Sequence, residues 1–156
     1  EVVLGPPHGG GCCQGSLDVV SLGNGGSIVL GFDHNGIVDG PGPDFVVFEN
    51  PFEIDEERVF AELATVALSD DGSDWVAFPC ATSEPPYDRC AGHSPVWRDG
   101  GDGPVDPEVD GGDAFDLAEV GLGRARYVRL EDRDDLVGLA GVFDLDAVGI
   151  IHAACP

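Results

Sequence analysis

Residues 60–79, FAELATVALSDDGSDWVAFP, form the stretch that decides the fold. The apolar runs FAELATVALS (60–69) and DWVAFP (74–79) flank the turn sequence DDGS. Apolar, β-branched and aromatic runs on either side of a short glycine-containing turn predict an antiparallel β-hairpin. A tight turn at Asp71-Gly72 returns Trp75 to the sheet, and we expect the Trp75 side chain to lie in the core.

The rest of the chain repeats this pattern of short apolar runs between Gly-, Pro- and Asp-rich turns. A second hairpin is predicted where GNGG separates two such runs, and DFVVFEN reads as a central strand. The further strands are expected at 16–22, 27–32, 44–50, 125–131 and 145–152, with helical character only at 116–122 and 134–140. Seven or more short strands predict one all-β domain over residues 1–156, an antiparallel β-sandwich.

Acidic residues greatly outnumber basic ones. The chain has 30 Asp and Glu against 7 basic residues, all Arg, which gives a net charge of -23. Clustered carboxylates repel one another unless a cation or solvent screens them, so we expect a bound divalent cation, calcium above others. The negative charge disfavours nucleic acid as a partner, and no run approaches the ~20 apolar residues of a membrane span.

The cysteines favour an oxidising compartment. Cys80 and Cys90 bracket a short loop and are expected to form a disulfide, which would add about 3 kcal/mol of stability. One of two adjacent cysteines near the N-terminus is expected to bond the cysteine near the C-terminus, and the odd thiol stays free or bonds a second chain; these are Cys12, Cys13 and Cys155. Since the chain starts at Glu1 and contains no Met, we expect an extracellular protein whose signal peptide has been removed.

The segment DGPGPD (39–44) is the first candidate calcium site. Asp39 and Asp44 stand on a turn stiffened by Gly and Pro, and Glu49 closes the strand that follows. Calcium takes six to eight oxygen ligands, and glycine-rich turns expose backbone carbonyls. The alternative is that Asp39 and Asp44 satisfy loop amides in Asx-turns. Glu49, in a mostly apolar strand, would need a cation or an Arg.

A second acidic segment is the Gly/Pro-rich loop at about 99–112. It lacks the D-x-D-x-D-G spacing of an EF-hand, which excludes that motif. Its acids, Asp99 to Asp110, are better interpreted as solvated charge on a loop.

Two sets of segments carry a resemblance to known families. VALSDDGSDWVAF (66–78), ARYVRLE (125–131) and FDLDAVGI (143–150) resemble strands of discoidin or coagulation-factor C-type domains, which are galactose-binding-like jelly rolls. The chain also resembles a group of bacterial secreted proteins described as cell-surface proteins, through VLGPP (3–7), SLDVVSLGNGGSIVLGF (16–32), DGPGPDFVVFENPF (39–52), GGDAFDLAEVGL (111–122) and FDLDAV (143–148).

This resemblance implies a secreted jelly-roll module and brings no established activity. It favours Asp113 and Asp116, within GGDAFD, as calcium ligands. Galactose-binding-like folds commonly hold a structural calcium near the chain ends, which makes Asp144 and Asp146 further candidates. A salt bridge from these two acids to Arg126 or Arg129 is the alternative.

The expected function is non-catalytic attachment to a glycan or a surface protein. Trp97 and Tyr87 lie in the loop region 80–99, where aromatic rings could stack on sugars, although packing within the loop is the simpler interpretation. The histidines are expected at the surface or as caps, and no G-x-S-x-G nucleophile motif occurs. The alternative function is a structural subunit that self-assembles into a fibre or surface layer, for which the odd cysteine or the N-terminal segment would provide the link.

Overall fold

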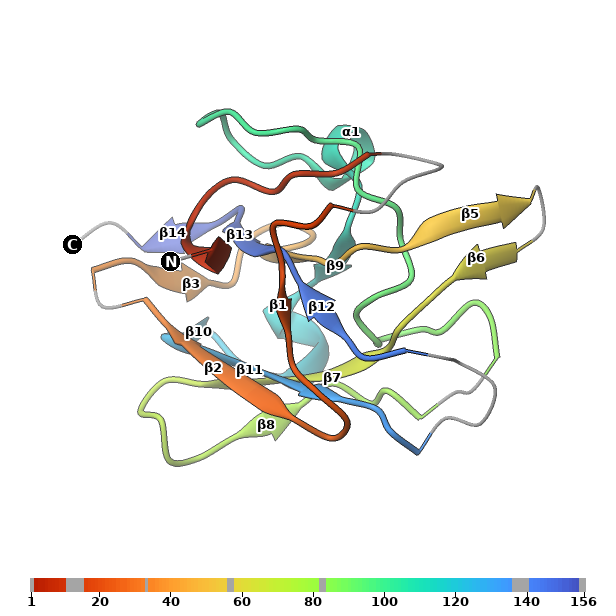
Figure 1. The fold of residues 1–156 in the computed structure, drawn as a ribbon. Helices are drawn as coiled ribbons and strands as arrows, with labels where there is room; N and C mark the ends of the chain where they lie inside the picture. Colours follow the sequence, from red (N-terminus) through yellow and green to blue (C-terminus); the bar gives the residue numbers. More distant parts are fainter. Residues whose placement is uncertain are drawn as a thin grey trace.

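Figure 1 shows a computed structural model of the chain, which describes residues 2–10, 16–32, 34–55, 58–81, 84–135 and 141–154. Short strands in several antiparallel sheets make up most of the regular structure, which confirms the all-β prediction. Among the described residues, helix is confined to three short pieces, η1 (Val2–Leu4), α1 (Pro107–Asp110) and η2 (Leu117–Val120). None of these helices has the length and apolar content that crossing a membrane would require.

Two sheets face each other in a sandwich-like arrangement. One has the order β2-β11-β7-β8 and the other has the order β13-β4-β9. Their strands are β2 (Ser27–Gly31), β11 (Tyr127–Asp132), β7 (Ala64–Ser69), β8 (Val76–Ala77), β13 (Ala147–Ile150), β4 (Phe45–Phe48) and β9 (Asp113–Phe115). Because side chains alternate between the faces of a strand, each sheet directs one row inward.

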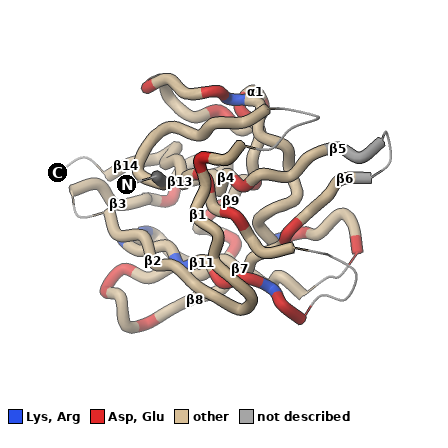
Figure 2. The backbone as a smooth tube through the Cα atoms, in the orientation of Figure 1, with Lys and Arg blue, Asp and Glu red and all other residues tan. Residues whose placement is uncertain are grey.

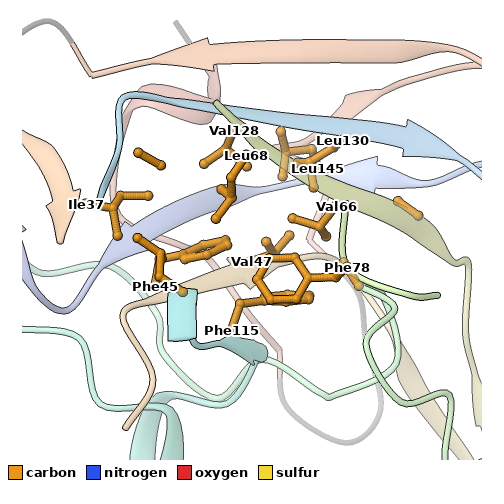
Figure 3. Close-up of a cluster of buried hydrophobic side chains, with 14 of the residues drawn as sticks. Ile37, Phe45, Val47, Val66, Leu68, Phe78, Phe115, Val128, Leu130 and Leu145 are labelled. Carbon is orange, nitrogen blue, oxygen red and sulfur yellow. The ribbon is translucent and has the colours of Figure 1, made fainter. Parts of the chain in front are cut away.

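The main core fills the space between these sheets, as Figure 3 shows. Val66 of β7 and Val128 of β11 lie opposite Phe45 and Val47 of β4, and all four are fully buried. Phe45 stacks on Phe115, with ring centroids 5.2 Å apart. Burial of each large apolar side chain contributes about 1.5–3 kcal/mol, so this cluster holds the two sheets together.

Shorter pairings close the remaining edges. β1 (Val20–Ser21) pairs with β12 (Asp144–Leu145), and β5 (Phe52–Asp55) pairs with β6 (Arg58–Phe60). A third group has the order β10-β3-β14, formed by β10 (Arg124–Ala125), β3 (Gly36–Val38) and β14 (Ala153–Ala154). β3 and β14 bring the segment before β4 next to the C-terminal end of the described chain.

The two expected hairpins have different outcomes. The hairpin within 60–79 is confirmed, because β7 pairs with β8 through Ala67↔Ala77 and Leu68↔Val76. The hairpin around GNGG is wrong: Gly26 N–H donates to Gly23 O and forms the turn, but β1 pairs with β12 while β2 pairs with β11. The local turn reverses the chain direction here, but core packing places β1 and β2 in different sheets.

Trp75 does not lie in the core, which corrects the sequence expectation. It is half-buried and directly precedes β8, an edge strand whose two residues are exposed. The guanidinium of Arg129 lies 4.7 Å from the centroid of its ring. Phe78, which is 2% exposed, enters the core instead and meets Phe115 edge-on.

The disulfide between Cys80 and Cys90 is confirmed. It packs with Ala61, Leu63 and Tyr87 in a small apolar cluster beside the main core. Cys12, Cys13 and Cys155 lie outside the described residues, as does most of the possible helix at 134–140, whereas 116–122 contains η2.

Candidate metal centres

Five carboxylates are buried in the described part of the chain. They belong to Asp44, Glu49, Asp113, Asp132 and Asp146. A buried charge is costly unless a hydrogen bond or an opposite charge compensates it. The arginine ion pairs that the structure describes involve other acids, namely Arg89–Glu119, Arg98–Asp110, Arg124–Asp70 and Arg133–Asp135. Backbone amides, histidines, a bound cation or a proton must therefore compensate the buried acids, which lie among the acidic segments drawn in red in Figure 2.

Asp39, Asp44 and Asp116 form the first candidate site. One carboxylate oxygen from each lies within 4.8 Å of the others. Asp39 follows β3, Asp44 precedes β4 and Asp116 follows β9. Because β4 pairs with β9, the N–H of Asp44 donates to the carbonyl of Phe115 (2.8 Å), which sets Asp44 beside Asp116. The structure thus brings together three predicted calcium ligands from separate segments.

The Asp44 carboxylate is fully buried and fixed by three donors. Its Oδ1 accepts from the N–H of Gly40 and lies 2.8 Å from His152 Nδ1, while its Oδ2 accepts from the N–H of Leu117. Gly40 is required for this arrangement, since a Cβ there would lie 2.3 Å from Nδ1 of His152. Asp116 caps η2 through the N–H of Ala118.

These contacts define what a cation could use at the first site. Asp39 is exposed and Asp116 is half-buried, and each places a carboxylate oxygen within 4.8 Å of one from the buried Asp44. Calcium needs six to eight oxygens at 2.3–2.6 Å, so water and carbonyls of the 40–43 turn would have to complete the shell. The donor set is all oxygen, which fits calcium better than zinc.

Glu49 lies in a second acidic region, at the end of β4. The residue is 2% exposed, and neither carboxylate oxygen has a hydrogen-bond partner among the described residues. Burial raises the pKa of Glu49 well above its usual value, and the charges of Glu62 and Asp113 raise it further. The amides of Asn50 and Asp144 lie close enough to lower this pKa, but neither has hydrogen-bonding geometry toward the carboxylate.

Asp113 borders the same region. Its Oδ2 accepts from the N–H groups of Gly92 (2.6 Å) and His93 (3.1 Å). His93 Nε2 lies 3.1 Å from Oδ1, but out of line for a hydrogen bond. Burial raises the pKa of Asp113, while the charge of His93 opposes that rise. Both side chains line a pocket of about 130 Å³.

Glu62 connects this region to Asp144. Its Oε1 accepts from the N–H of Val142 (2.9 Å). Burial raises the pKa of Glu62 to about 7, with further contributions from the charges of Asp144 and Asp132. Mutual repulsion among these carboxylates favours a proton or a cation in this region.

Asp144 and Asp146 have different surroundings. Asp146 Oδ2 accepts from the N–H of His8 (2.7 Å), and burial raises the pKa of Asp146. The expected alternative of a salt bridge to Arg126 or Arg129 is not formed by the described residues; Arg129 stacks on Trp75 and Arg126 lies 6.0 Å from the ring of Tyr127. Short strands with a break at Asp146 send the two acids to different neighbours.

The acidic loop at 99–112 is ordered by an arginine. Arg98 donates to the carbonyls of Gly100, Gly101, Gly103 and Pro104 and to the carboxylate of Asp110. Asp99 and Asp102 are exposed, as expected for solvated charge, whereas Asp110 is half-buried against the guanidinium. Asp106 caps α1. Hydrogen bonds among residues 98–110 therefore stabilise most of the loop.

The two aromatic candidates have different surroundings. Trp97 is 53% exposed and packs beside the Gly111 turn. Tyr87 packs against the Cys80–Cys90 cluster, with its ring 6.0 Å from that of His93. Trp97 can therefore offer a ring face to a ligand, while Tyr87 mainly supports its own loop.

Sequence reasoning missed His93, His152 and Glu62. The histidines were expected at the surface, and nothing in their local sequence reveals that His152 meets Asp44, 108 residues away. Glu62 had a usable signal, because it is a charged residue inside the apolar run 60–69.

No known family model, curated protein or solved structure matches this chain.

Proposed function

We propose that this chain is a calcium-stabilised, non-catalytic module of a secreted or cell-surface protein, with a jelly-roll, galactose-binding-like fold, that attaches to a glycan or another protein. The observation that carries the calcium part is the meeting of Asp39, Asp44 and Asp116, whose oxygens lie within 4.8 Å of one another. Asp39 and Asp44 are calcium candidates from their turn sequence, and Asp116 is one through the family resemblance.

Calcium at this site would act as a clamp between loops. Asp39 belongs to the connection from β3 to β4, whereas Asp116 belongs to the connection from β9 to η2. A cation shared by these acids would relieve their repulsion and join the two connections next to the fixed carboxylate of Asp44. Because it binds the folded state only, calcium at 100 times its Kd would add about 2.7 kcal/mol of stability.

The calcium experiment compares thermal unfolding with calcium and with EGTA. We expect calcium to raise the melting temperature of the wild-type protein, and Asp39→Asn and Asp116→Asn each to reduce that rise. Asp102→Asn, which removes an exposed acid of the 99–112 loop, serves as the matched control and should keep the full rise. An equal response in all four proteins would exclude calcium at this site.

Trp97 is the residue that would contact the glycan or protein ligand. Its indole is the largest exposed aromatic surface among the described residues and stands beside the loop that Arg98 orders. Such a ring, held on a rigid loop, suits stacking on a sugar or a protein surface. Trp97→Ala should abolish binding in a glycan array or a surface-protein pull-down, and Leu17→Ala, which changes a 99% exposed apolar residue, should leave it intact. Equal binding by both variants would remove Trp97 from the ligand site.

The self-assembling subunit remains the alternative proposal, but the described contacts give it little support. Val3 is buried in the main core, and the N–H of Gly9 donates to the carbonyl of Arg98. The N-terminal segment is thus engaged within its own domain, while the cysteines that could link chains lie outside the described residues. Non-reducing electrophoresis and electron microscopy test this alternative, for which a reducible ladder or fibres are required.

A further inference from the structure

The buried side-chain atoms that lack a hydrogen-bond partner are confined to one region of the molecule. Among the described residues there are four such atoms: both carboxylate oxygens of Glu49, Oδ1 of Asp113 and Oδ1 of Asp144. Buried polar atoms in folded proteins are nearly always paired, so unpaired ones call for a specific explanation. Here the unpaired atoms are all carboxylate oxygens, and all three residues are electrostatic neighbours of Glu49 or of its neighbour Glu62.

Strand register explains why these acids meet. Val47 of β4 pairs with Asp113 of β9, so the Asp113 side chain leaves the sheet on the same face as Val47. Glu49 follows Val47 by two residues and shares that face, which makes it a diagonal neighbour of Asp113. The backbone amide of Asp144 lies close to the Glu49 carboxylate, and the charge of Asp144 acts on Glu62, whose charge acts in turn on Glu49. The three acids thus belong to one acidic region around the end of β4.

We propose that Glu49, Asp113 and Asp144 bind a second divalent cation of calcium-like chemistry, separate from the Asp39–Asp44–Asp116 site. This inference goes beyond the proposed function and does not depend on the first site. The donors are again oxygens only, which suits a hard cation. Asp113 and His93 line a pocket, through which an ion could reach Asp113.

The spacing of these carboxylates means that a bound cation would have to bring them closer together. Unlike the first site, their oxygens do not all lie within 4.8 Å of one another, as judged over the described residues. Asp113 is fixed by two backbone amides, whereas nothing described holds the Glu49 carboxylate. Cation binding would therefore draw Glu49 toward Asp113 and Asp144, with water or backbone carbonyls completing the shell.

A neutral, protonated Glu49 is the competing explanation, and Glu49→Gln separates the two. The amide has nearly the same shape as the acid and carries no charge. If Glu49 is simply a neutral acid, the amide leaves calcium binding unchanged. If Glu49 is a ligand, the amide weakens calcium binding at this site.

The experiment measures calcium stoichiometry and affinity by isothermal titration calorimetry with calcium chloride. We expect two ions per chain for the wild type, one for Glu49→Gln and one for Asp39→Asn. Glu131→Gln, which alters an exposed acid on β11, is the control and should keep both ions. The affinity of the affected site should fall at least about tenfold, because one charged ligand is lost.

The calorimetry distinguishes the absence of the second site from the absence of the first site. Two ions in Glu49→Gln, or a single wild-type ion lost only in Asp39→Asn, would overturn this inference and leave the proposed function standing. A single wild-type ion lost only in Glu49→Gln would support this inference and overturn the first site. If Glu49→Gln does not fold, Asp144→Asn at a half-buried position provides the same comparison.

Discussion

Replacing Arg98 with alanine tests whether the acidic loop is held by its arginine or is simply solvated. The guanidinium donates five hydrogen bonds, of which the shortest is 2.7 Å to the carbonyl of Gly101. It also pairs with the Asp110 carboxylate at 3.0 Å, with exposed side-chain fractions of 10% for Arg98 and 14% for Asp110. The arginine is therefore much less solvated than an ordinary surface residue.

The magnitude follows from these contacts. Four of the acceptors are backbone carbonyls, most of them in exposed residues, so each bond contributes about 0.5 kcal/mol, the low end of the usual range. Loss of the ion pair leaves Asp110 partly buried without its counter-charge, which costs about 1–2 kcal/mol. We therefore expect Arg98→Ala to lower the free energy of unfolding by about 3–4 kcal/mol.

Urea denaturation gives this free energy directly. Arg98→Lys keeps the charge but loses the planar fork, so it should recover only a part of the stability. The effect should be equal with calcium and with EGTA, since Arg98 donates the bonds that hold the loop and the Asp39–Asp44–Asp116 site lies outside it. A loss below about 1 kcal/mol, as for a typical surface ion pair, would refute the argument that Arg98 orders the loop.

The remaining predictions test the calcium sites, the turn, the disulfide and the core. EGTA should lower the melting temperature, and Asp113→Ala should weaken that calcium response more than Asp102→Ala does; equal effects would contradict the buried site. Hydrogen bonds from the N–H groups of Asp74 and Ser73 lower the pKa of Asp71. Its folded-state pKa therefore lies below the unfolded one, so this stabilisation is complete above about pH 4 and disappears as the pH falls further; Asp71→Asn should flatten that acid limb in melting curves. Replacing both Cys80 and Cys90 with serine should cost about 3 kcal/mol in urea denaturation, and no loss would mean that the link constrains little. Phe45→Ala should cost about 3–5 kcal/mol, because a fully buried ring that stacks on Phe115 is lost; a cost below about 1 kcal/mol would contradict the described core.

The fold class could be predicted because its signals are local. Alternating apolar residues, the DDGS turn and the short Cys80–Cys90 loop each act over about ten residues, so β7–β8 and the disulfide were predictable. The GNGG turn was also visible, but the partners of its two strands were not. Strand pairing depends on which distant segments bury their apolar faces together, and that information is spread over the whole chain.

The candidate metal centres likewise combine local signals, which the sequence shows, with long-range contacts, which it does not. Sequence alone determined that the protein is all-β and acidic. Local turns and strand ends made Asp39, Asp44 and Glu49 candidate cation ligands, and the family resemblance added Asp113, Asp116, Asp144 and Asp146. Only the tertiary structure decided that Asp39, Asp44 and Asp116 meet, that His152 and His93 lie against Asp44 and Asp113, and that Arg98 binds the carbonyls of the acidic loop. The physical reason is the separation along the chain: Asp44 meets residues 73 and 108 positions away. Contacts over such distances exist only after the sheets have packed.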